Sequence, residues 1–300
     1  MRPALITGIS GFIGGHLWAL LGKHDDVIGV HGKSGKVPFR PELQYPVELT
    51  RLETLAQTIR DLAPRCIIHL AAISSTQVCR ENALQAWRVN HAAVRELTKT
   101  AEEVKARVIL ASSDQVFSGV RGNYREGDRP DPVNIYGETK KAAERSLFAV
   151  ITNGVVVRIN NTYGPLKFRG SPSFSEWILT RYQQHETIPL FRDQYRSPID
   201  VITLTHALVE LIDHSFRGIL HLGGYNRLSR VQFGRLLLES LGKKTSSIIE
   251  LKSADKDPEG TMPQDTSFDI SLAKQILKTP FPRIQEALAL VYEFNKSYSS

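Results

Sequence analysis

The sequence predicts an α/β protein built on a doubly wound parallel sheet, with a small C-terminal lobe. In the first half of the chain, short apolar runs alternate with helical patterns, which is typical of β–α–β units. Runs such as residues 155–157 lack a polar–apolar alternation, as expected for strands that are covered on both faces. A glycine-rich turn follows the first run, where such sheets bind ligands. The 300 residues suffice for this core and a lobe.

Six strands are expected from apolar runs, at residues 4–7, 27–31, 45–49, 66–70, 108–112 and 154–159. Four helices are expected between them, at residues 12–21, from an N-cap at Thr50 to about 62, through Trp87 to Leu97, and at about 135–150. Strands that are joined by helical crossovers pair in parallel and with right-handed connections. The first half of the chain is therefore expected to form one parallel sheet.

The alternation of strands and helices becomes irregular after about residue 165. Prolines and a glycine interrupt the pattern, at Pro165, Gly170, Pro172, Pro189 and Pro198. This region is expected to contain loops and short elements, and helices return near residues 203–214, 229–241 and 282–294. We therefore divide the chain into a core of residues 1–165 and a lobe of residues 166–300, some segments of which return to the core.

Composition and charge limit the function classes. Apolar residues make up 41% of the chain, and no run of 18 apolar residues predicts a membrane span. The formal net charge is +7, but the basic residues are scattered, so nucleic-acid binding is not expected. The first strand begins too early for a signal peptide, and Cys66 falls in a buried run. These features predict a cytoplasmic protein without structural disulfides, and we expect no metal site.

The turn after the first strand has the spacing G-x-x-G-x-x-G, at Gly8, Gly11 and Gly14. The first glycine permits a sharp turn, the second lets the backbone approach a pyrophosphate, and the third brings the helix close to the sheet. The helix then points its positive N-terminus at the phosphates. This turn predicts a dinucleotide site. Its other expected contact residues are Ser10, Phe12 and Ile13.

The end of the second strand indicates which dinucleotide binds. NAD sites usually carry a carboxylate there, about 20 residues after the glycines, to hold the ribose 2′-hydroxyl. Here the strand ends in His31, followed by Lys33 and Ser34, and these side chains could hold a 2′-phosphate instead. The sequence therefore favours NADP, with NAD as the alternative.

Tyr136 and Lys140 are four residues apart at the start of an expected helix, which places them on one helical face. A free tyrosine has a pKa near 10, and a nearby ammonium together with a positive nicotinamide ring would favour its phenolate. Two other Tyr–Lys pairs have this spacing, at residues 163/167 and 292/296. Only Tyr136 follows the fifth strand and its loop, so it is the expected acid–base group. Ser113 ends that strand and could donate a hydrogen bond to a substrate carbonyl.

Together these residues resemble the extended short-chain dehydrogenase/reductase family, over almost the whole chain. The segments that carry the resemblance are the glycine turn, residues 69–72, Asn90, residues 112–114, the Tyr136–Lys140 pair and residues 158–165. Within the family, residues 113–119, 124–126, 218–224 and 263–269 resemble the dTDP-4-dehydrorhamnose reductase branch, whose members reduce the 4-keto group of a nucleotide-linked deoxysugar with NADPH.

The resemblance implies roles for individual residues. Ser113, Tyr136 and Lys140 would be catalytic. Further cofactor contacts would be Leu70, Ala71, Ala72 and Asn90, with Asn90 supporting the lysine. Contacts to the sugar nucleotide would be Asp114, Gln115, Asn161 and Arg196. Ser113 replaces the threonine usual in this branch, and Gln115 stands where the branch often has tyrosine, which leaves the identity of the sugar open.

A reductase is the favoured activity. A 4,6-dehydratase of this fold needs an Asp–Glu acid–base pair, and the amide of Gln115 cannot act as a general base. Two alternatives stay open: an NAD-dependent sugar-nucleotide epimerase, and a cofactor-bound regulatory subunit that resembles the methionine adenosyltransferase regulatory protein. A homodimer, paired through the long helices, is also an open alternative.

Overall fold

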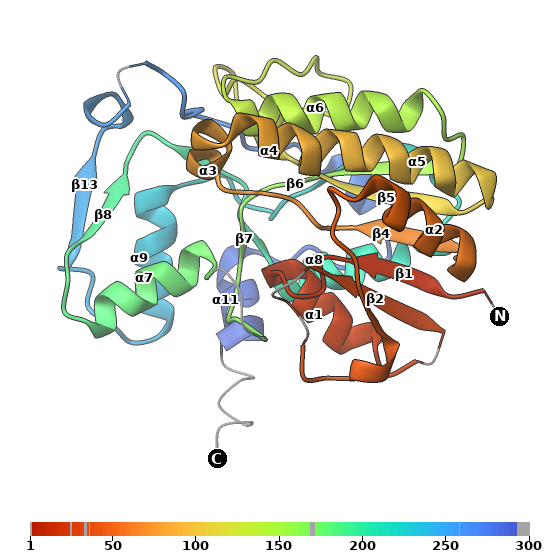
Figure 1. Cartoon of the computed structure of the whole chain (residues 1–300). Helices are drawn as coiled ribbons and strands as arrows, with labels where there is room; N and C mark the ends of the chain where they lie inside the picture. Colours follow the sequence, from red (N-terminus) through yellow and green to blue (C-terminus); the bar gives the residue numbers. More distant parts are fainter. Residues whose placement is uncertain are drawn as a thin grey trace.

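A seven-stranded parallel sheet forms the centre of the computed structural model, which describes residues 2–24, 26–32, 35, 37–168, 172–257 and 259–292 (Figure 1). Its strands are β1 (Ala4–Thr7), β2 (Val27–His31), β3 (Gln44–Pro46), β4 (Cys66–His69), β5 (Arg107–Ser113), β6 (Gly154–Ile159) and β11 (Gly218–Leu222). The spatial order is β11-β6-β5-β4-β1-β2-β3. The chain runs outward from β1 to β3 and returns to β4 on the other side of β1, so the predicted doubly wound fold is confirmed.

Helices cover both faces of the sheet (Figure 1). One face packs against α2 (Leu52–Leu62), α5 (Ala93–Glu103) and α6 (Ile135–Phe148), and the other against α1 (Phe12–Leu21), α8 (Val201–Glu210) and α10 (Ser271–Ile276). In β1 the side chains alternate between these two cores, with Leu5 in the first and Ala4 and Ile6 in the second. Burial on both faces explains why the strands are apolar throughout.

A lobe lies beyond one end of the sheet, at the left of Figure 1. It contains α7 (Phe174–Gln183), α9 (Arg230–Ser240), α11 (Ile284–Tyr292) and the parallel pair β8 (Ile188–Phe191) and β13 (Ile248–Leu251). Its separate core includes Ile178, Phe233 and Leu288. Two short pairs connect lobe and core, β7 (Thr162–Tyr163) with β10 (Ile199–Asp200) and β9 (Tyr195–Arg196) with β12 (Leu228–Ser229).

The structure departs from the expected elements in five main respects. The third strand is Gln44–Pro46 rather than residues 45–49, and Arg51, not Thr50, is the N-cap of α2. The expected helix through Trp87 and Leu97 is divided into α3 (Thr76–Glu81), α4 (Ala83–Trp87), a π-helical segment (Arg88–Ala92) and α5. Helix α7 and strand β11 were not expected. Strand β11 pairs with β6 and returns the chain from the lobe to the sheet.

Two further findings concern the predictions about disulfides, membrane spans and metal sites. Cys66 and Cys79 are both free and buried. Within the described residues, no helix is long and apolar enough to cross a bilayer, and no group of three or more His, Cys, Asp or Glu side chains could hold a metal ion.

Candidate active site

The glycine turn after β1 is tight because its glycines approach other backbone atoms. Gly8 has a φ of 79°, and a Cβ there would lie 2.8 Å from the Ala71 nitrogen. A Cβ on Gly14 would lie 2.0 Å from the Gly8 carbonyl oxygen. Gly11 is the N-cap of α1 and has no side chain with which to cap the helix. The first-turn N–H groups of α1 therefore stay available to a negatively charged ligand.

Replacing Gly14 with alanine is expected to weaken NADPH binding by ~10-fold or more, because the new methyl group must push the helix start away from Gly8. Gly15→Ala is the matched control, since a Cβ there would meet the Phe168 side chain at 3.1 Å and the Ile9 carbonyl oxygen at an ordinary contact distance of 3.6 Å. Titration of both variants with NADPH by intrinsic fluorescence checks this. Equal affinities in the two variants would contradict the prediction.

Two cavities open beyond the carboxyl ends of the strands, and they share Gly8, Gly11, Leu70 and Ala72 in their walls. The smaller has a volume of about 300 Å³ and extends toward β2 and β3. The larger has a volume of about 670 Å³ and extends past β5 and α6 into the lobe. The predicted cofactor residues that line one or both cavities are Gly8, Ser10, Gly11, Phe12, Ile13, Gly14, His31, Leu70, Ala71, Ala72, Tyr136 and Lys140.

The remaining predicted cofactor residues lie elsewhere. Lys33 and Ser34 fall outside the described residues. Asn90 is buried in the π-helical segment and does not line either cavity. Its amide accepts a hydrogen bond from the Ile73 nitrogen (2.8 Å) and donates to the Thr139 hydroxyl (3.2 Å), so it braces the helix turn that carries Lys140. The structure thus places Asn90 behind the cavity wall, in contact with a neighbour of the lysine.

Ser113, Tyr136 and Lys140 line the larger cavity together. Helix α6 starts close to the end of β5 because Gly137 lacks a side chain, and a Cβ there would lie 2.1 Å from the Gln115 carbonyl oxygen. The side chain of Asn134 caps this helix by accepting from the Gly137 nitrogen (2.9 Å). The N-cap fixes the first turn of α6, and with it the position of the Tyr136 ring beside the strand-end hydroxyl.

The electrostatics of the site favour a protonated phenol. Burial raises the pKa of Tyr136 well above its usual value, and a hydrogen bond with Ser113 opposes this only in part. The negative charge of Asp114 raises it further, so Lys140 alone does not produce the lowered pKa expected from the sequence. Burial also lowers the pKa of Lys140 to about 8, against the influence of Glu144. At neutral pH the cavity therefore contains a phenol and an ammonium, a suitable pair for proton donation.

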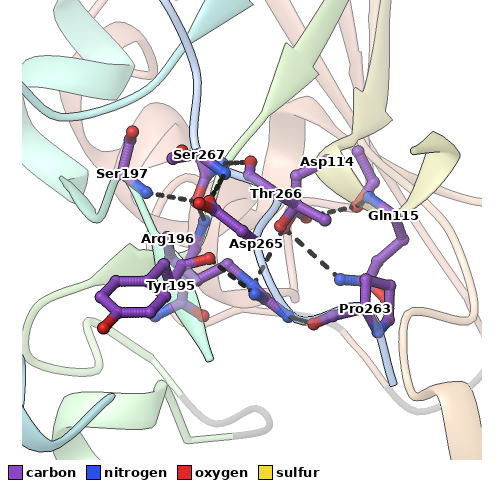
Figure 2. Close-up of polar contacts among 12 residues, drawn as sticks. Asp114, Gln115, Tyr195, Arg196, Ser197, Pro263, Asp265, Thr266 and Ser267 are labelled. Carbon is purple, nitrogen blue, oxygen red and sulfur yellow. Dashed lines mark hydrogen bonds and ion pairs between the residues drawn. The ribbon is translucent and has the colours of Figure 1, made fainter. Parts of the chain in front are cut away.

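The predicted substrate residues Asp114, Gln115, Asn161 and Arg196 also line the larger cavity. The guanidinium of Arg196, however, binds other groups of the protein (Figure 2). It donates to the carbonyl oxygens of Pro263 (3.0 Å) and Gln264 (3.1 Å), and its Nε lies 3.3 Å from Asp114. Asp114 in turn accepts from the Thr266 hydroxyl. This network ties residues 263–266 to the end of β5, so the structure gives Arg196 a structural role that the sequence did not predict.

The side-chain nitrogen Nδ2 of Asn161 is buried and has no hydrogen-bond partner among the residues that the structure describes. Sequence reasoning also missed residues that line this cavity from the lobe, among them Gln194 and Arg230. Arg230 follows the capping residue Ser229, and a local pattern of this kind predicts a helix start but no ligand contact.

The glycine turn and the serine, tyrosine and lysine in one crevice define the class of the short-chain dehydrogenases and reductases, which bind a nicotinamide dinucleotide. Comparison with known proteins identifies the family within this class. Residues 1–296 match the family described as the RmlD substrate binding domain, and the chain belongs to that family.

Three relatives indicate the breadth of this family. The chain is 26% identical to the probable low-salt glycan biosynthesis reductase Agl14 of Haloferax volcanii, over 99% of both chains. It is 28% identical to methionine adenosyltransferase 2 subunit beta of Xenopus tropicalis, over 93% of this chain and 85% of that one. The structure of dTDP-4-dehydrorhamnose reductase from Bacillus anthracis, in complex with NADP, has a TM-score of 0.86 at 21% identity, covering 98% of this chain and 99% of that one, and shows the shared fold.

Proposed function

We propose that this protein is an NADPH-dependent reductase of a nucleotide-linked 4-keto-deoxysugar, similar to dTDP-4-dehydrorhamnose reductase. The observation that carries the proposal is the shared cavity, in which Ser113, Tyr136 and Lys140 lie with the glycine turn. Membership of the RmlD family and similarity to a glycan biosynthesis reductase support a sugar-nucleotide substrate.

The residues of the two cavities fit a nicotinamide dinucleotide. The turn at Gly8, Gly11 and Gly14 would hold the pyrophosphate, and the smaller cavity would take the adenosine half near His31. NADP is preferred because β2 ends without a carboxylate and because a structural relative contains NADP. NAD is the alternative. When bound, NADPH would supply the hydride for C4 of the sugar.

The side chains of this protein would handle the carbonyl oxygen. Ser113 would orient the oxygen by a hydrogen bond, and Tyr136 would transfer its proton to it. Lys140 would stabilise the phenolate left behind. Burial keeps the phenol protonated beforehand, which is the form that a general acid requires. Residues 1–165 would bind the cofactor and residues 166–300 mainly the substrate. Asn161, near the end of the first range, would offer its Nδ2 to the sugar nucleotide.

NADPH oxidation in the presence of a panel of dTDP-, UDP- and GDP-linked 4-keto-sugars tests this function. At least one member should be consumed with a stoichiometric loss of NADPH absorbance, because the reaction transfers one hydride per carbonyl. No oxidation with any member would refute the proposal. Purified protein that carries NAD and interconverts sugar nucleotides without added reductant would identify an epimerase instead.

The similarity to methionine adenosyltransferase 2 subunit beta favours one second candidate, a cofactor-bound regulatory subunit. It predicts co-purification with a larger enzyme and no reductase activity. A subunit that only binds needs no buried phenol beside a lysine, so the joint placement of Tyr136 and Lys140 supports the reductase.

A further inference from the structure

Arg230 has a buried guanidinium nitrogen that no described residue pairs with. It is the first residue of α9, and its side chain lines the larger cavity from the lobe. Its Nη1 is buried and has no hydrogen-bond partner among the described residues, and its guanidinium lies 4.4 Å from the centre of the Phe174 ring. A buried donor without a partner costs free energy, so an unpaired guanidinium in a cavity indicates a ligand that the fold is built to accept.

The surrounding charges leave this part of the cavity positive. Asp114 acts on both Arg196 and Arg230, and Arg196 is the one in direct contact with it. A second carboxylate, Asp265, also acts on Arg196 but is paired with Arg227. Burial, together with the positive charge of Arg196, lowers the pKa of Arg230 to about 9. Lys140 lines the same cavity and is a third cation. The carboxylate that acts on it, Glu144, is already paired with Arg158. An anionic ligand would offset this excess.

We propose that Arg230 binds the diphosphate of the sugar-nucleotide substrate. The inference rests on the proposed function and names the residue that recognises the anionic part of the substrate. The pyrophosphate of the cofactor has its own cradle at the glycine turn, whereas Arg230 reaches the cavity from the lobe. The planar guanidinium matches two phosphate oxygens in a bidentate contact. A cavity of about 670 Å³ has room for a nicotinamide end and a sugar nucleotide.

Binding of dTDP and of thymidine to the NADP-saturated protein, measured by calorimetry, tests this assignment. Thymidine shares the nucleoside but lacks the diphosphate. In Arg230→Met, dTDP should bind ~10 to 100-fold more weakly, as expected for lost charged hydrogen bonds, while thymidine and NADPH affinities stay unchanged. Arg230→Lys should retain part of the dTDP affinity. UDP and pyrophosphate, titrated in parallel, extend the measurement to other bases and to the anion alone.

Arg235→Met is the matched control. Arg235 lies on the same helix but is exposed, and it pairs with Glu250 at 2.6 Å, so its removal should change no affinity. The melting temperature distinguishes a ligand-binding role from a structural one. Arg230→Met should melt at the same temperature as the wild type or higher, because it removes a buried, unsatisfied charge.

Three results would overturn the assignment: unchanged dTDP affinity in Arg230→Met, equal weakening of dTDP, thymidine and NADPH with a lower melting temperature, or no binding of any diphosphate to the wild type. The proposed reductase activity fails separately. If dTDP binding depends on Arg230 but the panel of 4-keto-sugars yields no NADPH oxidation, the diphosphate site stands and the reductase does not.

Discussion

Tyr136→Phe is expected to lower turnover of the 4-keto-sugar by ~10³-fold, about 4 kcal/mol of transition-state stabilisation, with little change in NADPH affinity. The substitution removes one oxygen, which is the hydrogen-bond partner of Ser113 and the proposed proton donor. The ring remains, and it packs against Cys79 and Ala86, so the fold should be preserved. Steady-state rates, with NADPH affinity from a separate titration, measure the two effects independently.

Tyr163→Phe is the control for this variant. Tyr163 is fully buried in the core of the lobe, and its hydroxyl has no hydrogen-bond partner within the described residues. Its loss should leave turnover unchanged. If Tyr136→Phe kept near-normal turnover, Tyr136 would not be the acid, and another group would have to protonate the carbonyl oxygen.

Much of this site could be predicted from the sequence because its signals are local. The glycine turn needs three glycines at fixed spacing, and the structure shows why: a Cβ on Gly8 or Gly14 would collide with backbone. Tyr136 and Lys140 are one helical turn apart in the sequence, so their shared face follows from helix geometry alone. The strands could also be predicted locally, because burial on both faces of the sheet makes each strand a continuous apolar run.

Strand β11 was missed because its position depends on pairing with residues far away in the sequence. Its five residues are interrupted by His221, which is fully buried between aromatic rings and hydrogen-bonds to the Tyr124 carbonyl oxygen (3.1 Å). The run lies beyond the part of the chain where strands and helices alternate, so no local pattern indicated that it returns to the sheet. Helix α7 had a local signal that was overlooked, the Ser173 N-cap followed three residues later by Glu176.

The arginines show the limit of sequence reasoning most clearly. The sequence predicted a substrate contact for Arg196 and none for Arg230. Which of the two has free donors depends on carbonyl oxygens at Pro263 and Gln264, more than sixty residues further along the chain. No local pattern records this, because tertiary contacts decide which guanidinium is already satisfied.

Arg158→Met is expected to destabilise the protein by about 3–5 kcal/mol, because it leaves a carboxylate buried without its partner. The Arg158 Nη2 and Nε lie 2.8 and 3.1 Å from the two oxygens of Glu144, and both side chains are almost fully buried between α6 and β6. Equilibrium unfolding in urea measures the change. The exposed pair Arg60–Glu103 serves as a comparison, and Arg60→Met should cost far less stability, because solvent screens this pair.

The double variant Arg158→Met/Glu144→Met separates two explanations for the loss. If the cost comes from the stranded carboxylate, the double variant should recover much of the stability, since two apolar side chains of similar volume need no partner. Its turnover should still fall, because Glu144 is the carboxylate that holds up the pKa of Lys140 and accepts from the Ser112 hydroxyl at the end of β5. A double variant as unstable as Arg158→Met would show that packing, rather than charge, dominates this part of the core. Recovery of stability without recovery of turnover would mean that the buried ion pair supports the candidate active site and adds no net stability to the fold.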